Sequence, residues 1–433
     1  MTSKLQPNPD VVPVVIGHYY NAYAVIRGFG ELGIRSILVT AGGRNFVQYS
    51  KYVERHVVVA DVNKDEDRFV SDLIALGKEI APRKGMFFPT HDEQLIAIAA
   101  HKEELLPYFE IPFSDLSVCR KIMDKACFRK ICEDAGIPTI KERLVHTRED
   151  ALACLQQLRL PLIVKLNIWD MSVIESFGDK IEIFYDENIY REHIQRFYDN
   201  APDGELLVQE YIDDCGDLTP NVNGFSDRGG NLCCVHIAGK IRQYPPRTGT
   251  STAYKAVDPA SEKYADIVEY TKKILRAYGF YGLFGIEFIY DGVENCYKVI
   301  EMNPRSEFLN YLPTARGQNL AYWLYQYHLG NPVEIPFYPQ VKDMTMSVPF
   351  NDYFYAVHLN KLNHPAFALT RKQWRQTLPR PTEHYGLTAK DFKPFLAAYI
   401  LSAISGFGTY LRIKHKIPNH IRTSDYFLRG KRS

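Results

Sequence analysis

Apolar runs that alternate with helical patterns fill the first hundred residues, and this alternation most restricts the fold. The runs have the length of buried strands and lie at 11–16, 36–39, 56–59 and 86–88. Helical patterns occupy the stretches between them, for example at 67–80. Strands that alternate with helices form parallel sheets, and ligands bind beyond the carboxyl ends of such strands. We therefore expect an α/β fold that begins with a doubly wound parallel sheet.

Changes in pattern along the chain predict its domains. A helix rich in Lys and Arg is expected over 114–136, ending at Gly136. We expect a first domain at 1–117 and a second at 118–332, with a small subdomain at about 140–212. The remaining residues, 333–433, have weaker periodicity and are interpreted as a C-terminal extension.

Composition excludes several classes of protein. The 52 Lys and Arg residues nearly balance the 51 Asp and Glu residues, so the chain lacks the basic field of a nucleic-acid-binding protein. The eight cysteines form no C-x-x-C pair, which favours reduced thiols in the cytoplasm. The N-terminal residues lack the apolar core of a signal peptide, and no apolar run of transmembrane length occurs. We expect a cytoplasmic protein without a transmembrane segment.

An apolar segment at 395–410 precedes Arg412, Lys414, His415 and Lys416. Such a segment is typical either of a buried C-terminal helix or of a helix that lies on a membrane surface. A buried helix is the preferred interpretation, because 16 residues are short for a membrane span. Contact of residues 395–416 with a membrane stays open.

Two acidic runs near residue 300 carry the sharpest chemical signal. They read G-I-E-F-I-Y-D at 285–291 and V-I-E-M-N-P-R at 299–305. The intervening residues include Gly292, so the runs predict a hairpin. Glu301 and Asn303 share a face, and Glu287 can meet them from the partner strand. Carboxylate and amide oxygens are the ligands that Mg²⁺ prefers.

Arg305 follows two residues later, where a guanidinium can bind phosphate or carboxylate through two hydrogen bonds. The alternative interpretation is a hairpin with a polar solvent face, in which Arg305 forms an ion pair with Glu301.

In the first domain, T-H-D-E at 90–93 suits either a substrate crevice or a helix cap. The cap is preferred, with Thr90 as N-cap and Glu93 completing a capping box.

The two acidic runs resemble the magnesium site of the ATP-grasp superfamily. Further segments resemble superfamily motifs in the expected order, namely Asp124–Lys125, P-L-I-V-K at 161–165 and L-V-Q-E-Y-I at 207–212. Over about 11–330 the chain resembles the D-aspartate ligase type of carboxylate–amine ligase. It departs from many members in its long, glycine-poor segment after Lys165. The resemblance implies an ATP-grasp fold of two α+β subdomains, preceded by a Rossmann-like domain.

The resemblance also implies the cofactors and the site. ATP and Mg²⁺ are expected, with two ions and with Mn²⁺ as a substitute. The implied metal ligands are Glu287, Glu301 and Asn303. The residues implied to bind ATP are Lys125 and Lys165 at the phosphates, Gln209, Glu210, Tyr211 and Ile212 at the adenine, and Asp217 at the ribose. The residues implied to act in catalysis are Arg242, Arg247 and Arg305.

These residues predict an ADP-forming ligase that activates a carboxylate as an acyl phosphate and transfers it to an amine. The resemblance suggests an amino acid such as D-aspartate as donor and a peptidoglycan precursor as acceptor. One alternative is a carboxylase or an enzyme like carbamoyl-phosphate synthase. Another is a regulatory protein that binds nucleotide without turnover. The substrates are small molecules, and a homodimer is one option for the assembly.

Overall fold

The computed structural model describes residues 9–43, 45–166, 181–212, 219–247, 249–341, 343–378, 382–384 and 388–415. Within these residues the chain divides into two compact units. The first unit contains Met1–Ile131, Pro220–Glu287 and Glu301–Ser433, and the second contains Cys132–Thr219 and Phe288–Ile300. The chain therefore leaves the first unit and returns to it twice.

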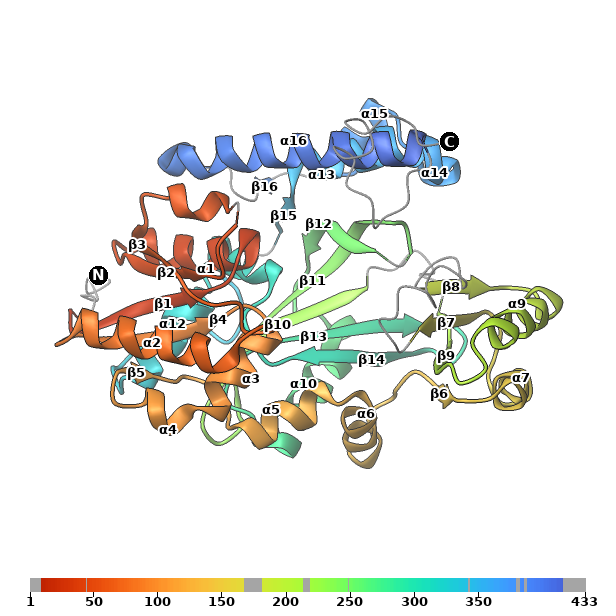
Figure 1. Cartoon of the computed structure of the whole chain (residues 1–433), viewed down its shortest axis with the longest axis horizontal. Coiled ribbons are helices and arrows are strands. Elements are labelled where there is room, and N and C mark those ends of the chain that lie inside the picture. The colour runs from red at the N-terminus through yellow and green to blue at the C-terminus, as the bar shows by residue number, and fades with distance from the viewer. Residues whose placement is uncertain are drawn as a thin grey trace. The chain divides into compact units, whose positions relative to one another are not determined.

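The first unit begins with a parallel sheet whose strands are joined by helices (Figure 1). The strands are β1 (Val11–Ile16), β2 (Ser36–Thr40), β3 (Val53–Val58), β4 (Lys84–Pro89) and β5 (Phe109–Glu110). The helices between them are α1 (Tyr19–Gly30), η1 (Phe46–Tyr49), α2 (Glu66–Ile80), α3 (Asp92–Ala100) and α4 (Lys102–Leu105). The strand order is β3-β2-β1-β4-β5. The predicted parallel sheet is confirmed.

Helices cover both faces of this sheet because successive side chains of a strand point to opposite faces. Val15 of β1 belongs to a core cluster that contains Phe29 of α1, whereas Val14 belongs to a cluster that contains Leu73 of α2. The carboxyl ends of β1 and β4 lead directly to His18 and His91. These ends therefore carry polar side chains at the edge where parallel sheets bind ligands.

The helix predicted over 114–136 is interrupted at Asp124. The structure has α5 (Leu116–Met123) and α6 (Lys125–Asp134), and Asp124 between them has extended backbone, with φ −74° and ψ 107°. Its Oδ1 accepts a hydrogen bond from the backbone N–H of Cys127 at 2.9 Å. A carboxylate at this position satisfies an N–H group at a helix start, so Asp124 begins a new helix. The prediction of one continuous helix was wrong.

A second, mostly antiparallel sheet follows, with strand order β14-β13-β10-β11-β12-β15-β16. Its strands are β10 (Pro220–Ser226), β11 (Leu232–Tyr244), β12 (Thr250–Ala256), β13 (Gly282–Asp291), β14 (Cys296–Asn303), β15 (Thr345–Ser347) and β16 (Thr382–His384). Strands β13 and β14 are neighbours joined by residues 292–295, which confirms the predicted hairpin. Strand β10 lies between β13 and β11, so its residues can contact side chains from both.

Further helices complete the first unit. They are α10 (Ala265–Tyr278), α11 (Tyr311–Ala315), α12 (Leu320–His328), α13 (Pro349–Phe354), α14 (Asn360–Asn363), α15 (Arg371–Gln376) and α16 (Phe392–Lys414). Shorter helical turns are η2 (Glu262–Tyr264), η3 (Phe308–Asn310), η4 (Tyr355–Leu359), η5 (Pro365–Phe367) and η6 (Ala389–Asp391). Tyr325 of α12 packs against Phe29 of α1, with ring centroids 5.6 Å apart. Helix α12 therefore joins the core of the parallel sheet.

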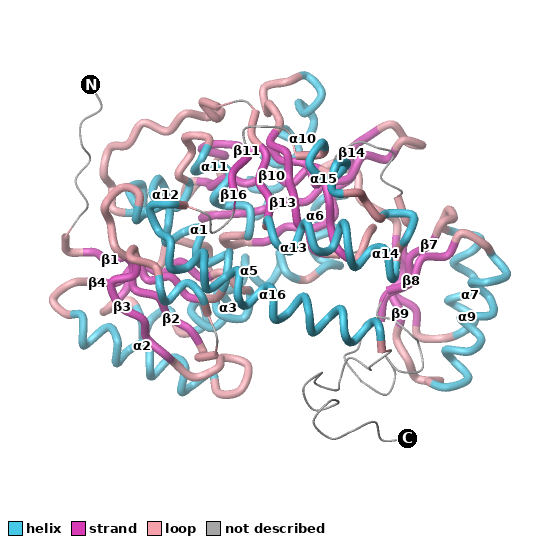
Figure 2. The backbone as a smooth tube through the Cα atoms, turned by 90° about the horizontal axis from the view of Figure 1, so that it is seen from above, coloured by secondary structure: helices cyan, strands magenta, loops and turns pink. Residues whose placement is uncertain are grey.

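The C-terminal segment docks onto the first unit through Asp391 and α16. The carboxylate of Asp391 accepts hydrogen bonds from the hydroxyls of Tyr23 at 3.1 Å and Ser50 at 2.5 Å. Helix α16 lies beside η1, α13 and α14 (Figure 2). One side of α16 nevertheless stays exposed, from Phe392 to Phe407. The preferred expectation of a buried C-terminal helix was therefore wrong, because composition alone does not show how much of a helix is covered.

The second unit has its own sheet, with strand order β6-β9-β7-β8. Its strands are β6 (Glu142–Val145), β7 (Leu162–Leu166), β8 (Ile181–Phe184) and β9 (Leu206–Glu210), and its helices are α7 (Arg148–Gln157) and α9 (Glu187–Asn200). Tyr190 of α9 is fully buried, and its hydroxyl donates to the carbonyl of Ala151 at 2.7 Å. This contact fastens α9 to α7 within one apolar core.

Candidate functional site

The hairpin presents the predicted metal ligands on a polar face of the first unit. In β14, Met302 is buried, whereas Glu301 and Asn303 on either side of it are not. This is the alternation expected of a strand. Asn221 of β10 is in register with Glu287 of β13, and its Nδ2 lies 3.5 Å from Glu287 Oε1. The structure thus adds a third strand to the predicted pair.

Two lysines counter the negative charge of these carboxylates. Lys240 of β11 donates from Nζ to Glu287 Oε2 at 2.8 Å. Neighbouring groups displace water from around the Glu301 carboxylate and raise its pKa, and the charge of Glu287 raises that pKa further, whereas Lys125 and Lys240 act in the opposite direction. Lys125 was predicted at this site from its motif. Lys240 was not, although the segment G-K-I-R placed it two residues before the predicted Arg242.

Glu307 is a third carboxylate that sequence reasoning missed. It is buried, and it accepts hydrogen bonds from Asn303 Nδ2 at 2.6 Å and Asn223 Nδ2 at 3.0 Å. Burial, followed by the charge of Glu287, raises the pKa of Glu307 to about 7. A Cβ atom at Gly285 would lie 1.9 Å from Glu307 Oε2, so glycine makes room for this carboxylate. The sequence could have pointed to Glu307 only through its position two residues after Arg305.

Arg305 connects the hairpin to the parallel sheet. Its guanidinium binds both carboxylate oxygens of Asp92, with Nε–Oδ1 at 2.5 Å and Nη2–Oδ2 at 3.2 Å. It also donates to Asn303 Oδ1 at 3.3 Å. Two parallel hydrogen bonds fix the plane of the guanidinium, which then orients the amide of Asn303. The alternative ion pair between Arg305 and Glu301 is replaced by this pair with Asp92.

The carboxyl ends of β1 and β4 bring two histidines together. The rings of His18 and His91 have centroids 5.7 Å apart, and burial lowers the pKa of each. Helix α3 has His91 as its N-cap, without a side-chain cap bond. The hydroxyl of Thr90 donates instead to the carbonyl of Ile16 at 3.0 Å. The predicted capping box was therefore wrong, because Thr90 satisfies a strand carbonyl rather than a helix N–H.

In the second unit, Lys165 and Gln209 form a polar chain across neighbouring strands. Lys165 Nζ donates to Gln209 Oε1 at 2.9 Å, and Gln209 Nε2 donates to Glu142 Oε2 at 2.8 Å. The chain follows the strand order, since β9 lies between β7 and β6. Lys165 is half-buried at the end of an apolar strand, the position expected for a lysine that meets phosphate. Its role in binding ATP stays a prediction.

The predicted adenine edge continues from Gln209. The buried carboxylate of Glu210 accepts the backbone N–H of Arg159 at 3.0 Å, and the backbone N–H of Tyr211 donates to the carbonyl of Pro161 at 2.8 Å. Ile212 is buried next to them. The side chain of Glu210 thus bonds to its own unit, which leaves backbone groups as the candidates for reading the base. Asp217 lies outside the described residues.

The two arginines of the segment R-Q-Y-P-P-R have other neighbours. Arg242 binds the fully buried carboxylate of Asp352 through Nε at 2.8 Å and Nη2 at 2.6 Å. Arg247 has φ 72°, and its guanidinium carbon lies 5.3 Å from the ring centroid of Phe367. The structure therefore joins both arginines to the C-terminal segment. The guanidinium of Arg242 thus pairs with Asp352 rather than with a carboxylate of the hairpin.

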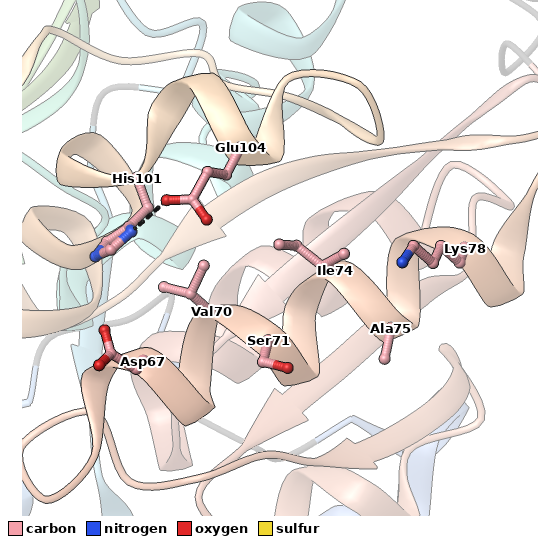
Figure 3. A pocket seen from close by; sticks show the side chains of 8 residues that line it. All are labelled: Asp67, Val70, Ser71, Ile74, Ala75, Lys78, His101 and Glu104. Atoms are coloured by element: carbon pink, nitrogen blue, oxygen red, sulfur yellow. Dashed lines mark hydrogen bonds and ion pairs between the residues drawn. The ribbon is translucent and has the colours of Figure 1, made fainter.

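A surface hollow of about 410 Å³ lies elsewhere on the first unit (Figure 3). It is lined along α2 by Asp67, Val70 and Lys78, and its other side carries His101 and Glu104. His101 Nδ1 lies 2.8 Å from Glu104 Oε1. None of the predicted site residues lines this hollow, so its size alone does not make it the site.

The hairpin suits Mg²⁺ by the chemistry of its donor set. Carboxylates held close together repel one another unless a cation neutralises them. Asn221 Oδ1 and Asn223 Oδ1 are buried oxygens without a hydrogen-bond partner among the described residues. Among all the residues that the structure describes, no three side chains of the types His, Cys, Asp and Glu converge closely enough to hold a metal by themselves. Magnesium commonly uses one or two carboxylates and fills its octahedron with water and substrate phosphates, so these residues fit it.

Several known proteins are similar to this chain in sequence. Residues 124–333 match the family described as carbamoyl-phosphate synthase L chain, ATP binding domain. The chain is 22% identical to D-aspartate ligase from Enterococcus faecium over 324 residues, which is 72% of this chain and 76% of that protein. It also matches carbamoyl phosphate synthase large chains and a section of one, but it spans only 16% to 36% of their length.

Solved structures show the same fold. L-amino acid ligase from Bacillus licheniformis superposes with a TM-score of 0.55 at 18% identity, covering 76% of each chain. The biotin carboxylase domain of 2-oxoglutarate carboxylase from Hydrogenobacter thermophilus has a TM-score of 0.55 at 19% identity, covering 75% of this chain and 72% of that one. That structure was solved in complex with MgADP and bicarbonate.

The family match begins at Asp124 and ends beyond the acidic hairpin, so it contains the motifs on which the sequence resemblance rested. The solved structures confirm the predicted ATP-grasp fold. Enzymes of this fold use ATP and Mg²⁺, as the complex with MgADP illustrates. The chain thus has the ATP-grasp fold, is similar over residues 124–333 to the ATP-binding domain of carbamoyl-phosphate synthase, and resembles D-aspartate ligase over most of its length.

Proposed function

We propose that the protein joins a carboxylate to an amine, at the expense of ATP, through an acyl phosphate. The observation that carries this proposal is the placing of Glu287 and Glu301 on adjacent strands beside Lys240 and Lys125. Carboxylates bind a metal ion and ammonium groups bind phosphate, so the two together suit a complex of metal and phosphate. The donor would be an amino acid, as the similarity to D-aspartate ligase supports.

In the first step, a carboxylate oxygen of the donor attacks the γ-phosphorus of ATP. The bond between that phosphorus and the bridging oxygen breaks, and ADP leaves. Glu287, Glu301 and Asn303 would hold Mg²⁺, which supplies positive charge to the phosphates when it is bound. Lys125 is the cation of the first unit proposed to neutralise phosphate, and Lys165 is that of the second.

In the second step, the amine nitrogen attacks the carbonyl carbon of the acyl phosphate. The carbon–oxygen bond to phosphate breaks, the nitrogen loses a proton, and an amide and inorganic phosphate result. No side-chain nucleophile is required by this sequence of steps, since ATP activates the carboxylate. Arg305 is proposed to orient Asn303 and to bind an anionic group of the donor or phosphate.

The finer assignments are also proposals. D-aspartate as donor and an amino group of a peptidoglycan precursor as acceptor follow from the name of a relative at 22% identity. The cysteine pattern, which contains no C-x-x-C pair, supports a cytoplasmic location. We further propose that the site binds two metal ions and accepts Mn²⁺ in place of Mg²⁺. The protein is proposed to form a homodimer, with domain limits at residues 117 and 332.

The test is ADP release from Mg-ATP in a screen of amino acids, each with and without amine acceptors. Release that needs one particular acid and amine would support the ligase, and mass spectrometry of the amide would identify both. The variant Glu301→Ala should abolish release, whereas Glu334→Ala, a matched change at an exposed position of the same unit, should not. Bicarbonate forms a separate arm of the screen. Release with bicarbonate alone would favour a carboxylase, and nucleotide binding without any release would favour a regulatory protein.

A further inference from the structure

Helix α16 presents an apolar stripe to solvent. Its members have between 49% and 60% of their surface exposed, and they are Phe392, Leu396, Ile400, Ile404 and Phe407. Their spacing of four, four, four and three residues places them on one side of a helix. At about 1.5 Å per residue, the stripe is about 22 Å long. A continuous apolar surface of this kind is typical of an interaction site.

The opposite side of α16 is fixed to the first unit, so the stripe cannot turn inward. On that side, Ala398 is buried in the core cluster that contains α1, and at the flank of the stripe the ring of Tyr399 lies 5.8 Å from that of Phe350 in α13. A Cβ atom at Gly406 would lie 3.1 Å from the ring of Phe354, which shows how closely the helix approaches α13. Figures 1 and 2 both show α16 lying lengthwise beside this part of the first unit.

Positive charge accompanies the stripe. Residues 392–433 contain eight Lys and Arg residues and one acidic residue, Asp425, although the whole chain has a net charge of +1. Lys393 and Lys414 are exposed near the two ends of the helix. Lysines beside an exposed apolar helix face are the pattern of helices that lie in the interface of a lipid bilayer. Each basic residue near an anionic leaflet adds to the attraction.

We propose that α16 binds the protein peripherally to the surface of an anionic lipid bilayer. The stripe enters the boundary between headgroups and acyl chains, and Lys393 and Lys414 contact the anionic headgroups. Residues Phe392–Leu411 have the length and composition of a membrane span. A span would require the packed side of the helix to leave α13, whereas an interfacial helix keeps those contacts.

A second copy of this chain is a poorer occupant of the stripe. Pairing through α16 would bring two segments of high positive charge together, and like charges in contact oppose association. An anionic surface neutralises the same charges. The proposal does not depend on the proposed ligase reaction, since no residue of the stripe belongs to the hairpin site.

The test is sedimentation of the full-length protein with vesicles. One set contains phosphatidylcholine alone, and the other contains about 30% phosphatidylglycerol to supply negative charge. The double variant Ile400→Glu with Phe407→Glu places carboxylates within the stripe. Ile189→Glu is the matched control, because Ile189 is 61% exposed on α9 of the second unit. Urea unfolding of each variant checks that it folds as the wild type does.

We expect the wild type and Ile189→Glu to sediment with the anionic vesicles and not with the neutral ones. The double variant should bind at least about tenfold more weakly, and added salt should weaken the binding of the wild type. Wild-type protein that stays in solution with anionic vesicles would overturn the proposal, as would unchanged binding of a folded double variant. A wild-type dimer that the double variant converts to a monomer, without vesicle binding, would overturn it in favour of a second copy.

Discussion

Replacing Glu307 by glutamine should make the metal-free protein more stable at high pH. Burial beside Glu287 raises the pKa of Glu307 from 4.5 to about 7, so the folded protein resists its ionisation. At pH below 4.5 this group is protonated in the folded and the unfolded chain, and it carries no penalty. As the pH rises from 4.5 to 7, the unfolded chain loses its proton first, and stability falls. Above pH 7 the full penalty remains.

The size of the penalty follows from the change in pKa. Each unit corresponds to 1.36 kcal/mol, so a rise from 4.5 to about 7 costs about 3 kcal/mol at pH 8. The glutamine side chain of the variant cannot ionise and avoids this cost. It also finds a partner, because Asn223 Oδ1 is buried without one among the described residues and can accept from the new amide. The variant should therefore exceed the wild type by up to about 3 kcal/mol at pH 8 and match it near pH 4.

Urea unfolding at several pH values, without metal or nucleotide, measures this difference. Glu54→Gln is a control of opposite sign, since a hydrogen bond from Arg83 lowers the pKa of Glu54. That variant should be less stable than the wild type at pH 8, and the difference should shrink as the pH falls through the pKa of Glu54. A Glu307→Gln variant whose stability relative to the wild type does not change with pH would refute the reasoning.

Two further changes test contacts around the site. Asp352→Ala leaves Arg242 without its buried partner, so it should lower the free energy of unfolding by about 3–5 kcal/mol. The control Asp343→Ala, at an exposed position, should change that free energy by less than about 0.5 kcal/mol. Urea unfolding measures both. Gly285→Ala forces the carboxylate of Glu307 to move and should cost about 1–3 kcal/mol. In a Glu307→Ala background the same change should cost less, and equal costs in both backgrounds would contradict the contact.

Patterns within short stretches of sequence correctly predicted elements whose structure depends on neighbouring residues alone. The strand from Val11 to Ile16 has the bounds of the predicted run, because an apolar run that ends at a glycine needs no distant partner to be recognised. The hairpin that carries Glu287 and Glu301 was recognised from its alternation and its turn. The break at Asp124 was missed, since an Asp inside a helical pattern is also compatible with a solvated helix position.

Contacts between residues that are far apart in the sequence could not be predicted from such patterns. Lys240 reaches Glu287 across β10, and Glu307 lies beside Gly285, so neither pair has a fixed spacing in the chain. Arg242 has its partner 110 residues later, at Asp352. A role for Arg242 in binding phosphate therefore requires that its ion pair open. The pairing shows why a loop rich in arginine is not evidence of a phosphate site by itself.

Exposure of α16 was unpredictable for a different reason. A buried helix and an interfacial helix share the same apolar composition, and only the packing of their sides distinguishes them. The stripe from Leu396 to Phe407 became evident once Ala398 and Gly406 were seen to face the protein.

The central claim is that the donor carboxylate attacks ATP to form an acyl phosphate, and transfer of an oxygen isotope tests it most directly. The donor found in the screen is labelled with ¹⁸O in its carboxylate and incubated with Mg-ATP and the amine. The account predicts one ¹⁸O atom in each inorganic phosphate released, and no labelled phosphate with Glu301→Ala. Phosphate without the label, or formation of AMP and pyrophosphate, would contradict it.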